Sequence, residues 1–154
     1  MTTIRKLELL HPALQRIIKA WNSKYSDKLY IDKEGVAYFG KLVETFRTPQ
    51  RQIALKAQNK VVTNASAWES AHQFGLAFDM CFCRPEVTFA WPEGELWTVL
   101  KNDIGECAHG IANIKWLGHI GDLGHYELVT RLSMAEMKKI NDEEGLLSLW
   151  NRFL

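Results

Sequence analysis

The sequence predicts a single α+β domain in which helices flank a small antiparallel sheet. Apolar residues recur at helical steps after Pro12 and after Ser133, whereas residues 76–83 alternate as a strand does. The 154 residues are 47% hydrophobic and 24% charged, which suits one domain with a sizeable core. Because no repeat, low-complexity segment or linker interrupts them, we treat residues 1–154 as one domain without an appended module.

The first helix is expected to begin at Pro12, which suits the first helical position because its missing N–H costs nothing there. The apolar residues that recur at three- and four-residue steps on its face are Leu14, Ile17, Ile18, Trp21 and Tyr25. Residues 24–35 are polar and rich in turn formers. Residues 36–46 are rich in β-branched and aromatic side chains, so they predict a strand.

A second helix is expected to begin at Thr48 and Pro49, with Thr48 as its N-cap and Pro49 as its first residue. It would continue through residues 52–58. Residues 59–70, which contain Asn and Ser, predict a loop.

The strand expected over residues 76–83 divides its side chains between two faces. One face carries Leu76, Phe78, Met80 and Phe82. The other face carries Ala77, Asp79, Cys81 and Cys83. A turn is expected to follow at Arg84 and Pro85.

The last third of the chain mixes helices and strands. Pro92 is expected to begin a short helix, with an apolar face formed by Leu96, Trp97 and Leu100. Residues 111–116 and 126–130 predict strands. Residues 133–136 form a capping-box pattern, so a C-terminal helix should begin there and bend near Gly145.

Composition and charge exclude several classes of partner and location for the protein. The formal net charge is +1, so no strong field indicates nucleic acid or a membrane surface as a partner. No apolar run reaches the roughly 20 residues that span a bilayer, so we expect no stable membrane insertion. The N-terminus lacks the pattern of a secretory signal, and we expect folding in the cytosol. An odd number of cysteines, three, argues against a disulfide framework.

Three residues form the natural ligand set for a catalytic metal ion: His72, Asp79 and His125. A catalytic zinc typically takes three protein ligands and leaves a further position open. Gly75 allows a tight turn between loop and strand, so His72 can fold back over Asp79. His125 lies at the start of the strand expected over residues 126–130, which could pair beside Asp79.

Two acids near His125 could support the reaction. Asp122, three residues earlier, could take a proton from water at the metal and pass it to a leaving amine. Glu127, two residues later, lies on the same strand face as His125 and could orient a ligand. A turn former between glycines is the alternative interpretation of Asp122.

Other candidates have ordinary explanations. Cys81 and Cys83 share a face with Asp79, so a sulfur-rich zinc site is conceivable, although both residues suit small buried positions. The imidazoles interpreted as packed or surface groups are His11, His109 and His119. His119 is nevertheless near enough to the site to contact substrate. Spacing alone therefore leaves the metal hypothesis open.

The residues around this set resemble three motifs of a zinc peptidase superfamily. Residues 70–79 read Ser-x-His-x-x-Gly-x-Ala-x-Asp, a pattern similar to the superfamily's signature. Its members include D-Ala-D-Ala carboxypeptidases, vancomycin-resistance D-Ala-D-Ala dipeptidases and L-alanyl-D-glutamate endopeptidases of bacteriophage endolysins. Residues 122–127 resemble the second motif, an acid followed by His, an aromatic residue and Glu. Residues 46–48 with Gln52 are similar to an upstream Tyr-Arg-Ser/Thr…Gln segment.

The resemblance implies that His72, Asp79 and His125 hold Zn²⁺. It also implies that Asp122 is the general base and acid. An Asp at this position, rather than a Glu, is more similar to the phage endopeptidases than to the dipeptidases.

The resemblance implies further roles upstream of the ligands. Arg47 would bind a substrate carboxylate or steady the oxyanion, because a guanidinium is a planar and permanently charged fork. The alternative is a surface arginine that caps the following helix. Ser70 would orient the site or bind substrate, and Gln52 would support Arg47 or the loop.

The sequence departs from the family at two places. Family members often carry Trp-Gly-Gly-Asp-Trp before the second motif, whereas residues 116–122 form a shorter loop with His119 where Asp is usual. This departure affects the expected substrate contacts and leaves the ligands unaffected. Some phage relatives bind calcium through an Asp-rich loop. The candidate loop here, residues 102–110, has only Asp103 and Glu106, so we predict no calcium control.

We therefore expect a phage-type endolysin, a zinc-dependent L-alanyl-D-glutamate endopeptidase that cleaves peptidoglycan stem peptides. A monomer without a wall-binding module resembles lysins of thin Gram-negative walls. It would be made in the host cytoplasm and reach the wall after a holin opens the membrane. The alternatives are a D-Ala-D-Ala carboxypeptidase or dipeptidase, and a non-catalytic peptidoglycan-binding or virion protein. The intact set of metal-binding and acidic residues disfavours the last.

Overall fold

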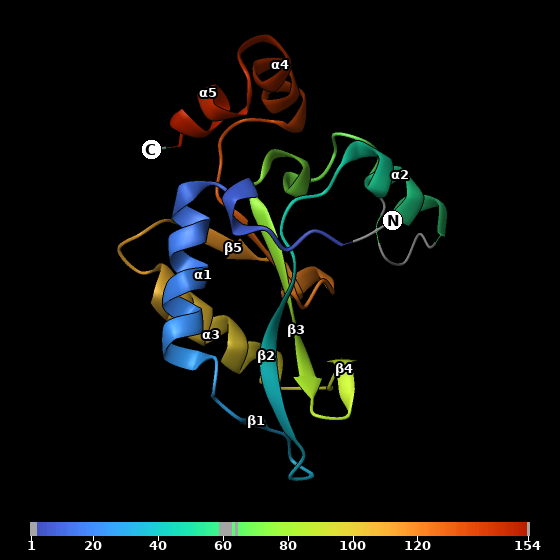
Figure 1. Ribbon diagram of the computed structural model, residues 1–154, viewed down its shortest axis with the longest axis vertical. Coiled ribbons are helices and arrows are strands. Elements are labelled where there is room, and N and C mark those ends of the chain that lie inside the picture. Colours follow the sequence, from blue (N-terminus) through green and yellow to red (C-terminus); the bar gives the residue numbers. More distant parts are fainter. Residues whose placement is uncertain (1–2, 59–62, 64, 154) are drawn as a thin grey trace.

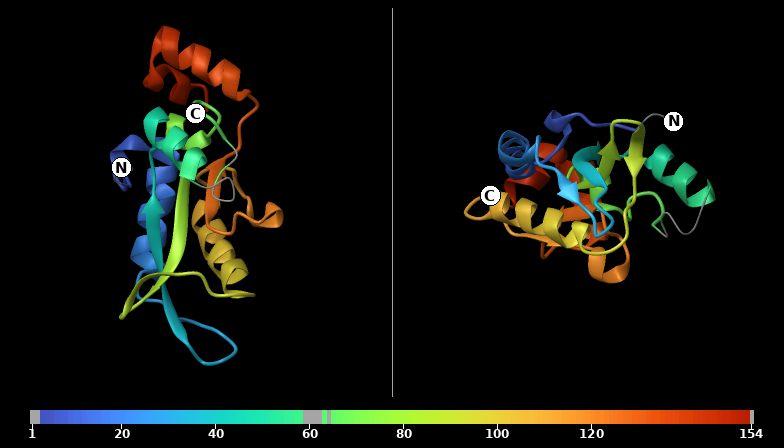
Figure 2. Two further views of the ribbon diagram at one scale, coloured as in Figure 1. Left: turned by 90° about the vertical axis from the view of Figure 1, so that its right-hand side faces the viewer. Right: turned by 90° about the horizontal axis from the view of Figure 1, so that it is seen from below.

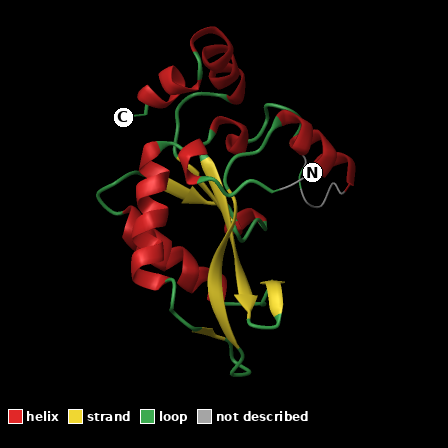
Figure 3. Cartoon of the chain, in the orientation of Figure 1, coloured by secondary structure: helices red, strands yellow, loops and turns green. Residues whose placement is uncertain are grey.

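The computed structural model describes residues 3–58, 63 and 65–153 and shows an antiparallel sheet with helices around it (Figure 1). The strands are β1 (Tyr30–Ile31), β2 (Ala37–Glu44), β3 (Ala77–Arg84), β4 (Val87–Ala90), β5 (Ile114–Trp116) and β6 (His125–Leu128). The α-helices are α1 (Pro12–Tyr25), α2 (Pro49–Gln58), α3 (Leu96–Ala108), α4 (Met134–Glu144) and α5 (Leu146–Asn151). The short 3-10 helices are η1 (Leu7–Leu9), η2 (Ala71–Phe74) and η3 (Gly118–Ile120). Figure 3 shows how helices and strands alternate along the chain, and this mixture confirms the predicted α+β class.

Strand β3 lies at the centre of the sheet, whose strand order is β1-β2-β3-β6-β5. Strand β2 pairs with one edge of β3, while β6 and β4 pair with the start and the end of its other edge. In this register Asp79 lies opposite Glu44 of β2 and His125 of β6. Because directly opposite residues share a face, these three polar side chains project to the same side of the sheet.

The two faces of β3 differ as its alternation predicts. Phe78, Met80 and Phe82 are almost fully buried in the core. Helices α1 and α3 cover this face (Figure 1). The core residues of α1 are Leu14, Ile17, Ile18 and Trp21. Full burial of one such side chain stabilises the fold by about 1.5–3 kcal/mol. The opposite face carries Asp79, whose side chain is 23% exposed, together with the fully buried Ala77 and Cys81.

Helices α4 and α5 pack at the end of the molecule where η2 lies (Figure 2). Ser133 and Glu136 form the predicted capping box, and Gly145 separates the two helices at the predicted bend. From α5, Trp150 Nε1 donates a hydrogen bond to the carbonyl of Phe74 in η2 at 2.7 Å. The C-terminal helices therefore hold the segment that leads into β3.

The structure corrects the expected third helix. Helix α3 begins at Leu96 rather than at Pro92, and it continues to Ala108. Most of residues 102–110, expected as a loop, is therefore helical. The helix is longer than expected because its apolar pattern extends beyond Leu100. The buried residues at four-residue steps are Leu96, Leu100, Ile104 and Ala108.

Several strand boundaries also differ from expectation. Strand β1 lies within the segment expected as turns, and β4 follows the predicted turn at Arg84 and Pro85. Strand β5 covers only the second half of residues 111–116, and β6 begins one residue before the expected start. Within the loop expected over residues 59–70, positions 59–62 and 64 lie outside the described residues.

None of the described helices has the length and apolar character that crossing a bilayer requires. Cys81, Cys83 and Cys107 are free thiols, in agreement with the expectation from their odd number.

Candidate metal centre

The structure brings His72, Asp79 and His125 together from η2, β3 and β6. One ligand atom of each residue lies within 4.8 Å of those of the other two. His72 Nε2 is 3.1 Å and His125 Nδ1 is 3.0 Å from the same oxygen of Asp79. Both imidazoles are buried, while 23% of the Asp79 side chain is exposed, so the group opens to water at its carboxylate.

Local backbone structure explains this convergence. The pairing of β3 with β6 places Asp79 beside His125. Helix η2 carries His72 and ends at Gly75, whose φ of +66° lies in the left-handed region that favours glycine. A Cβ atom at this position would lie 2.4 Å from the carbonyl oxygen of Leu9. Glycine therefore permits the turn that returns His72 over Asp79.

The outer nitrogen of each imidazole has a partner that fixes the ring. His72 Nδ1 lies 2.8 Å from the carbonyl oxygen of Thr45, which can only accept, so this nitrogen donates and, in the neutral ring, Nε2 would carry the lone pair that a cation needs. His125 Nε2 lies 2.9 Å from Glu127, which also pairs with Lys115 at 2.6 Å. Such outer partners are usual for metal-binding histidines. The inner nitrogens, His72 Nε2 and His125 Nδ1, are thus the atoms available to a cation.

Asp79 and His125 stabilise each other's charged forms. Burial would raise the pKa of the Asp79 carboxyl, but the charges and hydrogen bonds of His72 and His125 hold that pKa well below its usual range. Burial would lower the pKa of His125, but its hydrogen bonds to Asp79 and Glu127 raise the pKa to about 10. The Asp79 carboxylate therefore lies between one nitrogen of each imidazole, and a metal cation could bind at the same atoms.

The donor set fits a catalytic zinc ion. Two imidazole nitrogens and one carboxylate oxygen are a ligand set that zinc accepts, with a position left for another molecule. Among the described residues, the group that could hold a metal ion contains no cysteine. Cys81 is fully buried and outside this group, so the sulfur-rich alternative has no support.

Asp122 lies at the margin of the group, in the loop between η3 and β6. Its Oδ2 is 3.9 Å from His125 Nδ1, and 56% of its side chain is exposed. Partial burial, aided by the charge of Asp79, raises the pKa of Asp122, although His125 opposes the shift. Gly124 lets this loop approach β3, because a Cβ atom there would lie 2.2 Å from the carbonyl oxygen of Met80. Asp122 can therefore exchange protons with water beside the three donors.

Arg47 is buried against Asp79 rather than exposed as a helix cap. Its Nε and Nη2 both bind one oxygen of Glu44, and its Nη1 donates to Gln52 Oε1 at 2.9 Å. Its Nη2 also lies 3.4 Å from Asp79 Oδ2. The second oxygen of Glu44 accepts from Arg51 at 2.7 Å. Glu44 is a residue that sequence reasoning missed, and an acid three residues before Arg47 was the signal that could have found it.

The fold has a counterpart among solved structures. The crystal structure of the L-Ala D-Glu endopeptidase ChiX from Serratia marcescens matches the chain with a TM-score of 0.57 and 20% sequence identity. The match covers 81% of this chain and 84% of that one. The chain has the fold of an L-Ala D-Glu endopeptidase. No family model and no curated protein sequence matches the chain. The predicted resemblance is confirmed at the level of this peptidase fold.

Gln52 and Ser70, the two predicted support residues, lie outside the group of three donors. Gln52, which accepts from Arg47, donates through Nε2 to the carbonyl of Ala65 at 2.7 Å. It therefore links Arg47 to the segment that leads into η2. Ser70 comes directly before η2, and its carbonyl accepts from the backbone of Gln73 at 3.0 Å. The role of Ser70 toward substrate stays a prediction.

His119 lies apart from the three donors. It is exposed on η3, where its Nδ1 lies 3.1 Å from the carbonyl oxygen of Trp116. Within the described part of the chain, no hydrogen bond joins His119 to the metal centre. A contact between His119 and substrate also stays a prediction.

Proposed function

We propose that the protein is a zinc-dependent peptidase that hydrolyses the L-Ala–D-Glu bond of peptidoglycan stem peptides. The observation that carries this proposal is the convergence of His72, Asp79 and His125 within the fold of an L-Ala D-Glu endopeptidase. The resemblance of residues 70–79 and 122–127 to zinc peptidase motifs supports it separately, because those motifs name the same residues.

His72, Asp79 and His125 would hold the zinc ion through the atoms that already face one another. When bound, zinc supplies Lewis-acid chemistry, which polarises a carbonyl group and makes water more acidic. Asp122 accepts the proton of the attacking water and donates it to the leaving amine. Its position, partial exposure and raised pKa suit both transfers.

Arg47 acts as a positioning residue in this scheme. Its guanidinium is bound to Glu44 and Gln52, so its contact with Asp79 Oδ2 would orient that carboxylate. Glu127 similarly holds His125 through Nε2. This proposal assigns Arg47 to the support of a metal ligand instead of the substrate contact expected from the family resemblance.

We further propose that the enzyme acts as a phage-type endolysin. Asp122, in place of the Glu found in dipeptidases, supports this role through its resemblance to phage endopeptidases. A monomer made in the host cytoplasm would reach the wall after a holin opens the membrane. Expression of the protein in a Gram-negative cell should then cause lysis only when a holin is present. Lysis without a holin, or no lysis with one, would contradict this role.

The bond cleaved can be identified on intact wall material. Zinc-loaded protein would be incubated with Gram-negative sacculi, and the soluble fragments would be analysed by mass spectrometry. New fragments with N-terminal D-Glu are the expected result. Release of free D-Ala would indicate a D-Ala-D-Ala carboxypeptidase or dipeptidase instead. Retained binding without release would indicate a non-catalytic wall-binding protein.

A further inference from the structure

A second group of charged side chains lies on the same face of the sheet as the metal centre. Lys41 of β2 is paired with Cys81 of β3, two residues along the strand from Asp79. Because alternate residues of a strand share a face, Lys41 and Asp79 project to the same side. Side chains in such diagonal positions start about 7–8 Å apart. The Lys41 and Asp79 side chains therefore start from neighbouring positions on one face of the sheet.

An aromatic ring and a second cation accompany Lys41. Ala90 of β4 pairs with Phe82 on the core face, so the neighbouring Phe89 projects to the face of the metal centre. Lys41 Nζ lies 5.1 Å, and Arg5 Cζ 5.7 Å, from the centroid of the Phe89 ring. Phe89 is 38% exposed and Arg5 is exposed. We call Arg5, Lys41 and Phe89 the cationic shelf.

Arg5 and Lys41, the two cations of the shelf, are not neutralised by a carboxylate of the described residues. Arg5 Nε donates to the carbonyl of Val43 at 2.9 Å, which positions the guanidinium without neutralising it. Among the described residues, no carboxylate forms an ion pair with Arg5 or Lys41. Arg47 differs from these two cations, because it is buried and forms an ion pair with Glu44. The shelf is therefore better placed than Arg47 to attract an anion from solution.

We propose that the cationic shelf binds a free carboxylate of the substrate peptide next to the bond that is cleaved. The proposal rests on the function proposed above. Glutamate has two carboxyl groups and only one can form the next peptide bond, so the other stays free directly after an L-Ala–D-Glu bond. Lys41 and Arg5 would donate charge-assisted hydrogen bonds to that carboxylate. Phe89 would pack against the methylene groups beside it.

The test compares two synthetic peptides that differ in one group. The first contains L-Ala–D-Glu with a free carboxylate, and the second carries a carboxamide in its place. The wild-type protein should cleave the acidic peptide with a kcat/KM about tenfold higher, mainly through a lower KM, because hydrogen bonds to charged groups are the stronger ones. Lys41→Met and Arg5→Gln should each reduce this preference, whereas Lys41→Arg should retain it.

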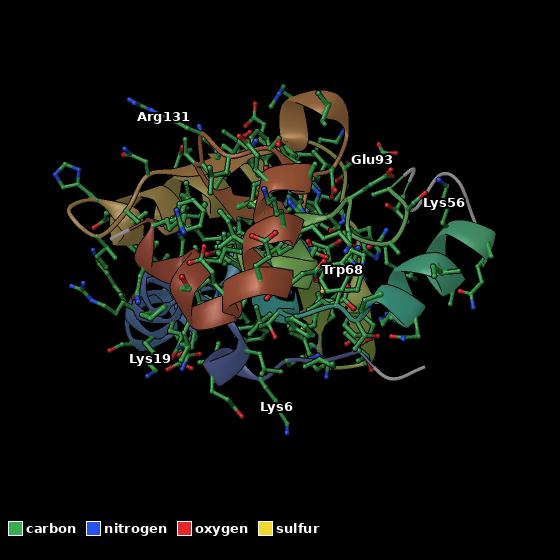
Figure 4. The ribbon with its side chains drawn as sticks, turned by 90° about the horizontal axis from the view of Figure 1, so that it is seen from above. Lys6, Lys19, Lys56, Trp68, Glu93 and Arg131 are labelled. Atoms are coloured by element: carbon green, nitrogen blue, oxygen red, sulfur yellow. The ribbon has the colours of Figure 1, made fainter. Side chains whose placement is uncertain are left out.

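Lys19→Met is the matched control. It removes the same charge from α1, which covers the opposite face of the sheet. Figure 4 shows Lys19 beside α1, across the molecule from Lys56 of α2. This control should keep the full preference for the acidic peptide. A loss of preference in Lys19→Met equal to that in Lys41→Met would indicate a general effect of net charge and would overturn the proposal.

Calorimetric titration of both peptides into the metal-free protein separates recognition from catalysis. The same preference should appear as a lower Kd for the acidic peptide, and Lys41→Met should abolish it. If Lys41→Met raises the Kd of both peptides equally, the shelf does not recognise the carboxylate, and the proposed function stands. If the wild-type protein cleaves neither peptide, the proposed function fails, while the two Kd values still decide the role of the shelf.

Discussion

At the scale of single residues, the metal centre depends on imidazoles that are fixed at both nitrogens. His72 points one nitrogen at Asp79 and holds the Thr45 carbonyl with the other. His125 does the same between Asp79 and Glu127. The rings therefore cannot turn away freely, and the three residues are already arranged as a metal ion would need them.

Replacement of one donor should remove the metal. We expect His72→Ala to lose bound zinc on dialysis and to lose more than about 100-fold in activity, since even outer partners of a ligand are worth 10–100-fold. Elemental analysis of the dialysed protein measures the zinc content. His109→Ala, which removes an exposed imidazole after α3, should retain the metal. Full zinc content in His72→Ala would show that the ligand assignment is wrong.

Replacement of the acid–base residue should separate chemistry from metal binding. Asp122 lies outside the donor set, so Asp122→Ala should keep its zinc. Its kcat should fall by about 10²–10⁴, the usual contribution of a positioned acid or base. Peptide hydrolysis and zinc content would be measured on the same samples. An Asp122→Ala variant with wild-type turnover would exclude this role.

At the scale of elements, the turn between η2 and β3 is the sensitive point. Gly75→Ala would put a left-handed φ on alanine and bring its Cβ within 2.4 Å of the Leu9 oxygen and 2.8 Å of the Trp150 ring. Gly110→Ala is the matched control, because its φ is +76° but no atom lies within 4 Å of the new Cβ.

The control variant should lose about 1 kcal/mol of unfolding free energy through backbone strain alone. Gly75→Ala should lose clearly more and should also bind zinc less tightly, since His72 precedes this turn. Urea denaturation and zinc titration provide the two measurements. Equal losses in both variants would mean that the close approach to Leu9 and Trp150 is unimportant.

Elements with a strong local pattern could be predicted from the sequence. Helix α1, the alternating faces of β3 and the capping box of α4 depend on neighbours within a few residues. Strand β1 has two residues, too few to carry such a pattern, and it exists only through its pairing with the longer strand β2. The true start of α3 was obscured by Pro92, which suits the first turn of a helix but here lies before it.

At the scale of the whole molecule, only part of the candidate site could be predicted. The ligand set was predicted from spacing and motif resemblance, and the structure brings these residues together. The contact of Glu44 with Arg51 could not be predicted from the sequence, since it depends on how β2 and the following helix meet. The cationic shelf could not be predicted either, because the register of β2 and β4 against β3 determines where Lys41 and Phe89 lie.

The fold as a whole should limit its stability at high pH. Tyr30 donates to Asp103 at 2.8 Å, and Tyr126 is buried with no hydrogen-bond partner for its hydroxyl in the described structure. Burial is the main reason that the pKa of each phenol is raised. The folded state therefore binds these protons more tightly than the unfolded state. Stability should be unaffected below pH about 10 and should fall as the pH rises above it.

Tyrosinate absorbance and circular dichroism, followed together from pH 8 to 13, measure this coupling. Ionisation of the two buried phenols should coincide with the loss of ellipticity. Complete ionisation of all tyrosines in a protein that keeps its native spectrum would contradict the burial of Tyr30 and Tyr126.

His72 and Asp79 come from the neighbouring elements η2 and β3, whereas His125 comes from β6, which is 46 residues beyond Asp79 in the sequence and adjacent to it in space. A zinc ion held by all three would therefore cross-link the chain, and unfolding would have to release it. At a free zinc concentration of about 100 times Kd, this linkage would add roughly 2.7 kcal/mol to the unfolding free energy. Metal supply would then set the lifetime of the protein against proteolysis as well as its turnover.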